Sequence, residues 1–176
     1  MALKSTVFKA ELDIADVERN YYQTHALRLA RHSSETDERM MVRLLAFACH
    51  ADERLTFTEG LANVDEPDLW QKDLTGQIEL WIEVGQPDER RLLKACGRAA
   101  QVVVYCYASS SSIWWNQVAA KLERAKNLTV FQIPNASALA QLAERNMQLH
   151  CMIQEGSLWW TAGTETLQVE REKLRG

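Results

Sequence analysis

The sequence has no long apolar segment. Its N-terminal stretch, MALKSTVFKAELD, lacks the continuous apolar run of a signal peptide, and nothing else approaches the roughly 20 apolar residues of a membrane-spanning helix. We therefore expect a soluble, cytoplasmic protein without a membrane partner. The chain has 176 residues, of which 47% are hydrophobic. It can bury one core, so we expect a single domain over residues 1–176.

Cysteine and histidine patterns that would indicate a zinc site or a disulfide framework are also missing. The four cysteines, Cys49, Cys96, Cys106 and Cys151, are far apart, lie in apolar segments and form no CxxC pair. Free cysteine is among the most buried residue types, so we interpret all four as buried, reduced thiols. The four histidines are scattered and form no HExxH motif. We interpret them as packing or surface residues.

Three common motifs of nucleotide and hydrolase chemistry are absent. The chain contains no GxGxxG, no glycine-rich loop ending in Gly-Lys-Ser/Thr and no GxSxG. These absences disfavour a dinucleotide-dependent enzyme and a serine hydrolase. The formal net charge of −4 provides no overall basic surface, so nucleic-acid binding would require a local one.

The segment from Pro67 to Pro87 predicts a β-hairpin around the turn at residues 74–77. In its second half, Ile78, Leu80, Ile82 and Val84 alternate with Glu79, Trp81, Glu83 and Gly85. This period of two predicts one face for the core and one open, acidic face. If the hairpin is centred on the turn, antiparallel pairing places Asp68 roughly opposite Glu83. Both carboxylates could then bind one cation.

Alternation and helix signals predict the elements around this hairpin. Residues 6–14 and 21–31 predict an antiparallel hairpin, and the Ser34-x-x-Asp37 helix-start signal leads into a buried helix over residues 38–51. Residues 87–98 predict a helix with Pro87 at its first position, and residues 101–107 predict a central strand buried on both faces. Further helices and strands alternate up to residue 146, and three strands follow. We expect an α/β (α+β) fold with a mixed central sheet flanked by helices and with antiparallel strands added at both ends.

Three segments carry a family resemblance: EPDLW from residue 66, DLTGQIELWIEVGQPDE from residue 73, and KACGRA from residue 94. Through them the chain resembles the YaeQ family over essentially its whole length. The resemblance implies a variant of the PD-(D/E)XK nuclease fold, with a restriction-endonuclease-like core at about residues 37–146. In that superfamily an Asp and a Glu-x-Lys triplet bind a divalent metal. Asp68 matches the first position and Glu83 the second, whereas Gly85 stands where the lysine would be.

These matches make Asp68 and Glu83 the candidate ligands of Mg²⁺, which typically takes one or two protein carboxylates. The lysine would position the attacking water or stabilise the transition state. Lys94, about two turns into the following helix, and Gln86, which could orient a water, are the candidates to replace it. The first hypothesis is therefore a magnesium-dependent nuclease or phosphodiesterase-like protein that acts on nucleic acid, with Asp68, Glu83, Gln86 and Lys94 as catalytic residues.

The second hypothesis is a catalytically degenerate module that keeps the nuclease fold and binds nucleic acid or a protein partner. Gly85 and the acidic net charge favour it. A basic stripe formed by Arg91, Lys94 and Arg98 is compatible with phosphate contacts or with a plain solvated helix face. Glu79 could be a third ligand or a surface acid. Each tryptophan pair, at 114–115 and 159–160, has one member for the core and one for a surface.

Overall fold

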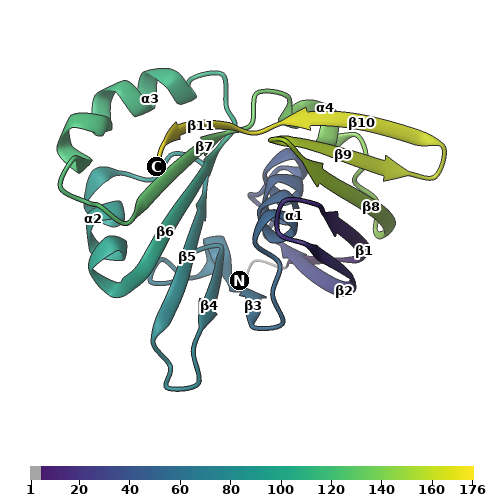
Figure 1. Ribbon diagram of the computed structural model, residues 1–176, viewed down its shortest axis with the longest axis horizontal. Helices are drawn as coiled ribbons and strands as arrows, with labels where there is room; N and C mark the ends of the chain where they lie inside the picture. The colour runs from purple at the N-terminus through teal and green to yellow at the C-terminus, as the bar shows by residue number, and fades with distance from the viewer. Residues whose placement is uncertain (1–4) are drawn as a thin grey trace. The chain divides into compact units, whose positions relative to one another are not determined.

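The computed structural model describes residues 5–176, which form two compact units. The first unit contains the residues up to Cys49 and Asn135–Arg171, and the second contains His50–Pro134 and Glu172–Gly176. Each unit has a mixed β-sheet with helices beside it (Figure 1). The predicted fold class, mixed α and β structure with flanking helices, is confirmed.

The sheet of the first unit joins strands from both ends of the chain. Strands β1 (Thr6–Asp16) and β2 (Tyr21–Arg31) form the predicted antiparallel hairpin, and β8 (Asn146–Gln154), β9 (Ser157–Ala162) and β10 (Glu165–Glu170) form an antiparallel meander. A parallel pairing of β1 with β8 connects them, in the order β10-β9-β8-β1-β2. The terminal strands therefore make a sheet of their own.

One face of this sheet is apolar, because alternate residues of β1 and β8 point to the same side. Parallel pairing places Leu12 beside Leu149 and Ile14 beside Cys151. The buried members of the two strands are Phe8, Ala10, Leu12, Ile14, Met147, Leu149, Cys151 and Ile153. The predicted alternation in these strands is confirmed.

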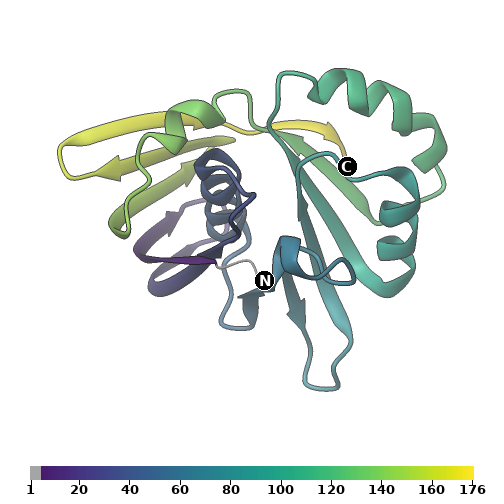
Figure 2. The same ribbon diagram turned by 180° about the vertical axis from the view of Figure 1, so that it is seen from behind.

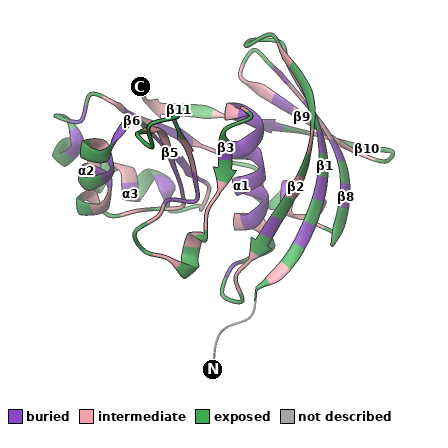
Figure 3. Cartoon of the chain, turned by 90° about the horizontal axis from the view of Figure 1, so that it is seen from below, coloured by how far each residue is buried: buried purple, intermediate pink, exposed green. Residues whose placement is uncertain are grey.

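Helix α1 (Asp37–His50) follows β2, and every residue from Met40 to Cys49 is buried (Figure 3). Its start is capped by Thr36, whose hydroxyl accepts the backbone N–H of Arg39 at 3.1 Å. The helix contacts β2 through the rings of Phe47 and His25, whose centres are 5.1 Å apart. The buried helix predicted at residues 38–51 is confirmed, with each end one residue earlier in the chain. The other helix of this unit, α4 (Ala136–Ala140), is short.

A buried ion pair holds α1 to the chain that precedes it. The guanidinium of Arg43 donates to both carboxylate oxygens of Glu35, at 2.9 and 2.6 Å, and to the carbonyl oxygen of Ala30 at 3.1 Å. Arg39 donates a further bond to Glu35 at 2.7 Å. Two charges in a dry environment require this degree of hydrogen bonding, because each loses its hydration on burial.

The sheet of the second unit has six strands, in the order β11-β7-β6-β5-β4-β3 (Figure 2). The central pairs β5–β6 and β6–β7 are parallel and the others are antiparallel. The strands are β3 (Leu55–Phe57), β4 (Leu69–Lys72), β5 (Ile78–Val84), β6 (Ala99–Cys106), β7 (Leu128–Gln132) and β11 (Glu172–Arg175). The helices are η1 (Gly60–Ala62), α2 (Glu89–Arg98), α3 (Ser111–Val118) and η2 (Ala119–Leu122).

Helices α2 and α3 cover one face of this sheet (Figures 1 and 2). Their core includes Trp81, Leu92, Ala95, Val102, Val104, Trp114, Leu122 and Val130. On the opposite face of β6, Tyr105 stacks on Phe131 with ring centres 5.3 Å apart, and its hydroxyl lies 2.7 Å from Nε2 of His50. All residues from Val102 to Cys106 are buried, so the prediction of a strand covered on both faces is confirmed.

The expectation for the cysteines is correct for three residues and wrong for one. Cys49, Cys106 and Cys151 are buried, whereas Cys96 on α2 is half-buried. All four thiols are free, and burial raises the pKa of Cys106 and, more strongly, of Cys151. These two groups are therefore neutral thiols at neutral pH.

The tryptophan pairs behave as predicted. Trp114 and Trp160 are buried, and Trp115 and Trp159 are partly exposed. In the part of the chain that the structure describes, no helix combines the length and apolar character needed to cross a membrane.

Replacing Arg43 with alanine is expected to lower the free energy of unfolding by about 3–5 kcal/mol, because Glu35 would stay buried without its bidentate partner. Urea denaturation followed by circular dichroism measures the change. Arg90→Ala, at an exposed position of α2, is the matched control and should change stability by less than about 0.5 kcal/mol. Equal effects of the two substitutions would contradict the role assigned to Arg43.

Candidate functional site

The β4–β5 hairpin is built around Asp73. Its carboxylate accepts the backbone N–H groups of Thr75 and Gln77 at 2.8 and 3.0 Å and the Thr75 hydroxyl at 2.6 Å. These bonds, that of the hydroxyl first, lower the pKa of Asp73. Gly76 has φ +88°, in the left-handed region that favours glycine. The turn predicted at residues 74–77 is confirmed.

The register of this hairpin brings Asp68 next to Glu83. Leu69 pairs with Ile82, and the backbone N–H of Asp68 donates to the Ile82 carbonyl oxygen at 2.9 Å. Continuing the ladder by one residue places Asp68 opposite Glu83, as the pairing arithmetic predicts. The Asp68 side chain turns toward β5, where Oδ2 accepts the backbone N–H of Val84 at 2.8 Å. The two acids therefore lie side by side where β5 ends.

The expectation of an open, acidic face on β5 is wrong. Asp68 is 3% and Glu83 4% exposed, and Trp81 is buried with the α2 core. Glu79 is partly exposed, and it forms an ion pair with Arg54. The physical reason is the docking of α2 over this face, which a strand pattern cannot predict because amphipathic alternation does not say what covers the polar side.

Glu83 is held by two N–H donors. Its Oε1 accepts Nε1 of Trp81 at 2.9 Å and Nε of Arg91 at 2.8 Å. Burial raises the pKa of Glu83, the Arg91 guanidinium opposes this rise, and the negative charge of Asp68 adds to it, leaving the pKa above its ordinary value. The strand register places Asp68 beside Glu83, so the negative charges of the two carboxylates repel each other.

Arg91 also binds the chain that leads into Asp68. Its Nη1 donates to the carbonyl oxygen of Val64 and its Nη2 to that of Glu66, the latter at 2.8 Å. About two turns further along α2, Arg98 donates to the carbonyl oxygen of Asp65 at 3.3 Å. Two of the three residues of the basic stripe are thus engaged with backbone carbonyls. Segment 63–66 is attached to α2 by these bonds.

Gln86 and Lys94, the residues predicted to replace the lysine of the nuclease motif, lie on different parts of the second unit. Gly85 has φ +110°, and its N–H donates to the Tyr105 carbonyl oxygen at 2.9 Å. A side chain at this position would be strained, so the backbone itself excludes a lysine. The Gln86 amide donates to the Ser110 hydroxyl at 2.9 Å, and Lys94 is on the exposed side of α2.

Arg91 is the cation that the structure brings to the acid pair, a role that the sequence analysis did not assign to it. The sequence contained a feature that predicts this contact. The connection between β5 and α2 is short, so the first turn of the helix, which carries Arg91, must lie at the end of the strand. The helix begins at Glu89 rather than at the predicted Pro87, with the Asp88 side chain accepting the N–H of Arg91 at 2.8 Å as the N-cap. This cap orients the turn that carries Arg91.

Comparison with known proteins identifies the family. The family model described as YaeQ protein matches residues 1–171. The chain belongs to the YaeQ family. It is 44% identical over 173 residues to the uncharacterized protein YaeQ of Salmonella typhi, covering 97% of this chain and 96% of that protein. It is 45% identical over 172 residues to the protein of the same description from Escherichia coli K12, covering 96% and 95%.

Crystal structures of YaeQ proteins have the same fold. The YaeQ protein from Xanthomonas axonopodis pv. citri matches with a TM-score of 0.95 at 44% identity, over 98% of this chain and 99% of that chain. The YaeQ protein from Pseudomonas syringae matches with a TM-score of 0.94 at 37% identity, over 98% and 97%. The family resemblance carried by the hairpin and the following helix is confirmed.

The donor set of this YaeQ chain is compatible with a hard divalent cation. Asp68 and Glu83 offer carboxylate oxygens, and Mg²⁺ commonly takes one or two of these from the protein. When both carboxylates are ionised, their combined negative charge exceeds the single positive charge of Arg91, and a cation would neutralise the excess. Among residues 5–176, no group of three or more His, Cys, Asp or Glu side chains is positioned to hold a metal ion. Water or phosphate would have to complete the coordination.

Replacing Arg91 with alanine is expected to lower the free energy of unfolding by about 2 kcal/mol, because Glu83 loses a charged hydrogen-bond donor in a buried place. Hydrogen exchange should also accelerate in segment 63–66, which loses two anchoring bonds. Lys94→Ala, one turn away on the same helix, is the control and should leave both measurements unchanged. Unchanged exchange in Arg91→Ala would contradict the attachment of the segment by this side chain.

Glu83→Gln should make stability less dependent on pH. The raised folded-state pKa means that the native protein holds this proton more tightly than the unfolded chain does. The stabilisation by protonated Glu83 is present at low pH and is lost as the pH rises through the folded pKa. The stability of the native chain relative to Glu83→Gln should therefore decrease from about pH 4 upward. Urea denaturation at several pH values measures this stability difference, and the exposed Glu53→Gln is the control. If the stability of the native chain relative to Glu83→Gln increased with pH, the prediction would be refuted.

Proposed function

We propose that Asp68 and Glu83 bind a divalent metal ion, Mg²⁺, and that the protein is a metal-dependent phosphodiesterase-like protein acting on nucleic acid. The observation that carries the proposal is the in-register placement of two buried carboxylates on neighbouring strands, with an arginine from the next helix against one of them. The PD-(D/E)XK nuclease fold that the resemblance to the YaeQ family implies also supports it, since proteins of that superfamily place their metal-binding acids on a comparable hairpin.

Each residue has a distinct part in this proposal. Asp68 and Glu83 hold the ion, which when bound can polarise a phosphoryl oxygen and lower the pKa of a water. Arg91 donates to Glu83 and opposes the rise of the Glu83 pKa that burial causes. Lys94 lies on the exposed side of α2 and supplies positive charge to the phosphate backbone. Gln86 orients a water molecule once its amide leaves Ser110.

A second candidate is a binding module that keeps the fold without the chemistry, with nucleic acid or a protein as its partner. A specific observation favours it: the Arg91 guanidinium is bonded to Glu83 and to two carbonyl oxygens. In this alternative the arginine takes the place of the metal as the positive charge beside the acids. Gly85, whose backbone excludes a lysine, favours it as well.

Calorimetric titration with Mg²⁺ and Mn²⁺ distinguishes the two. The native chain should bind one ion, and Asp68→Asn and Glu83→Gln, which keep the shape of the side chains, should each reduce binding strongly. Glu79→Gln, on the same strand outside the acid pair, is the matched control and should bind like the native chain. Equal binding by all four proteins would refute the metal site.

Cleavage of single-stranded, duplex and branched nucleic acids then tests the reaction. Activity that needs Mg²⁺ and disappears in Glu83→Gln supports the phosphodiesterase. Ion binding without cleavage of any substrate, together with retention of nucleic acid or of a protein partner, supports the binding module.

A further inference from the structure

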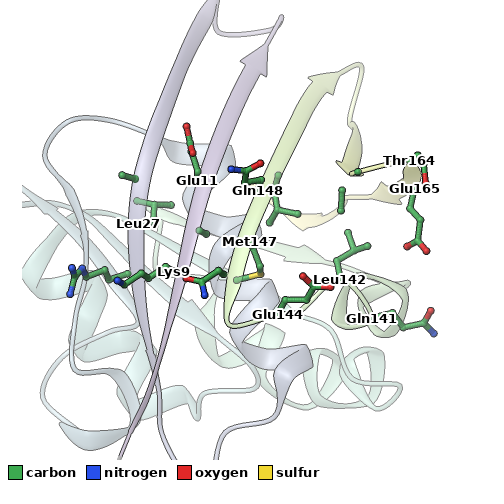
Figure 4. A pocket seen from close by; sticks show the side chains of 17 residues that line it. Lys9, Glu11, Leu27, Gln141, Leu142, Glu144, Met147, Gln148, Thr164 and Glu165 are labelled. Atoms are coloured by element: carbon green, nitrogen blue, oxygen red, sulfur yellow. The ribbon is translucent and has the colours of Figure 1, made fainter.

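A groove of about 950 Å³ lies on the sheet of the first unit. Residues of β1, β2 and β8 form its floor, and two short segments border it, one from Gln141 to Glu144 and one at the β9–β10 turn (Figure 4). Its volume is in the range of small-molecule binding sites. None of its residues belongs to the Asp68–Glu83 site, which is in the other unit.

One end of the groove carries two cations on neighbouring strands. Lys9 and Arg28 are directly opposite each other in the β1–β2 ladder, and both are exposed. Like charges at paired positions of an antiparallel ladder are destabilising, and within residues 5–176 neither side chain has an ion-pair partner. Asn146 is the partner of Lys9 on β8 and adds an amide to the same row. This row has the composition of a site for an anionic group.

The far side of the groove carries acids. Glu165, next to Thr164, lies on the opposite side from Lys9, and Glu144 lies between them on the border (Figure 4). With Glu11 on the floor, the lining has three acids against two bases, so a purely anionic ligand would be repelled. Separated charges of opposite sign match a zwitterion. The amides of Gln148 and Gln141 could pair with the peptide groups of such a ligand.

The distance between the two ends suits a short peptide. Neighbouring strands are about 4.8 Å apart, so the three steps from β1, which carries Lys9, to β10, which begins at Glu165, span about 14 Å. An extended chain covers about 3.3–3.6 Å per residue, so three or four residues fill this length.

We propose that the groove binds short zwitterionic peptides. The peptide carboxylate lies at Lys9, Arg28 and Asn146, and the peptide ammonium lies at Glu144 and Glu165. Amides of the floor hydrogen-bond the peptide groups between these ends. This site is independent of the proposed metal site, so either proposal can fail without the other.

Trialanine is the probe, and its binding to the full chain is followed by two-dimensional ¹⁵N–¹H NMR. We expect shifts confined to the groove residues and their neighbours. Trialanine amide, which lacks the carboxylate, and N-acetyl-trialanine, which lacks the ammonium, should each bind about tenfold more weakly, because each loses hydrogen bonds to a charged group. Absence of groove shifts, or equal binding of the three peptides, would overturn the proposal, and neither outcome depends on a variant.

Matched variants locate the two ends. The double variant Lys9→Gln, Arg28→Gln should no longer distinguish trialanine from its amide while still distinguishing it from the acetylated peptide. The double variant Glu144→Gln, Glu165→Gln should show the reverse. Lys173→Gln, on β11 of the other sheet, should behave like the native chain. Loss of both discriminations in each double variant would overturn the assignment of the ends.

Discussion

The ion pair between Glu83 and Arg91 connects three parts of the second unit. It attaches α2 to the end of β5, and through the remaining donors of Arg91 it attaches segment 63–66 to the same helix. The Arg91 guanidinium also stabilises the charged form of Glu83 and so opposes the rise of the Glu83 pKa that burial causes. The geometry of the candidate site therefore depends on a helix residue outside the hairpin.

Sequence patterns predicted the hairpin well and its surroundings less well. Alternation in β5 and a turn at Gly76 were sufficient to place Asp68 opposite Glu83, because strand pairing is set by local rules. They could not show that Trp81 and Glu83 would be buried, because burial depends on where α2 packs. The same limit explains why Lys94 and not Arg91 was predicted to supply the positive charge. Helical spacing predicts a basic stripe of Arg91, Lys94 and Arg98, but it does not show which of the three contacts β5.

Gly85 illustrates how one backbone conformation constrains the chemistry of the site. Its left-handed φ allows the chain to leave β5 and reach the Asp88 cap within four residues. The tight connection places Arg91 on Glu83, and it removes the position from which a lysine side chain could extend. The same turn therefore excludes a lysine side chain at residue 85 and brings Arg91 to Glu83.

The parallel pairing of β1 with β8 has a consequence for how the chain folds during synthesis. Asp13 on β1 meets His150 on β8 across a sequence separation of 137 residues. While the ribosome produces the intervening unit, the β1–β2 hairpin keeps the apolar row containing Leu12 and Ile14 without its neighbouring strand. Closing such a distant contact is slow, so the nascent hairpin has an extended period in which other chains or chaperones can bind it.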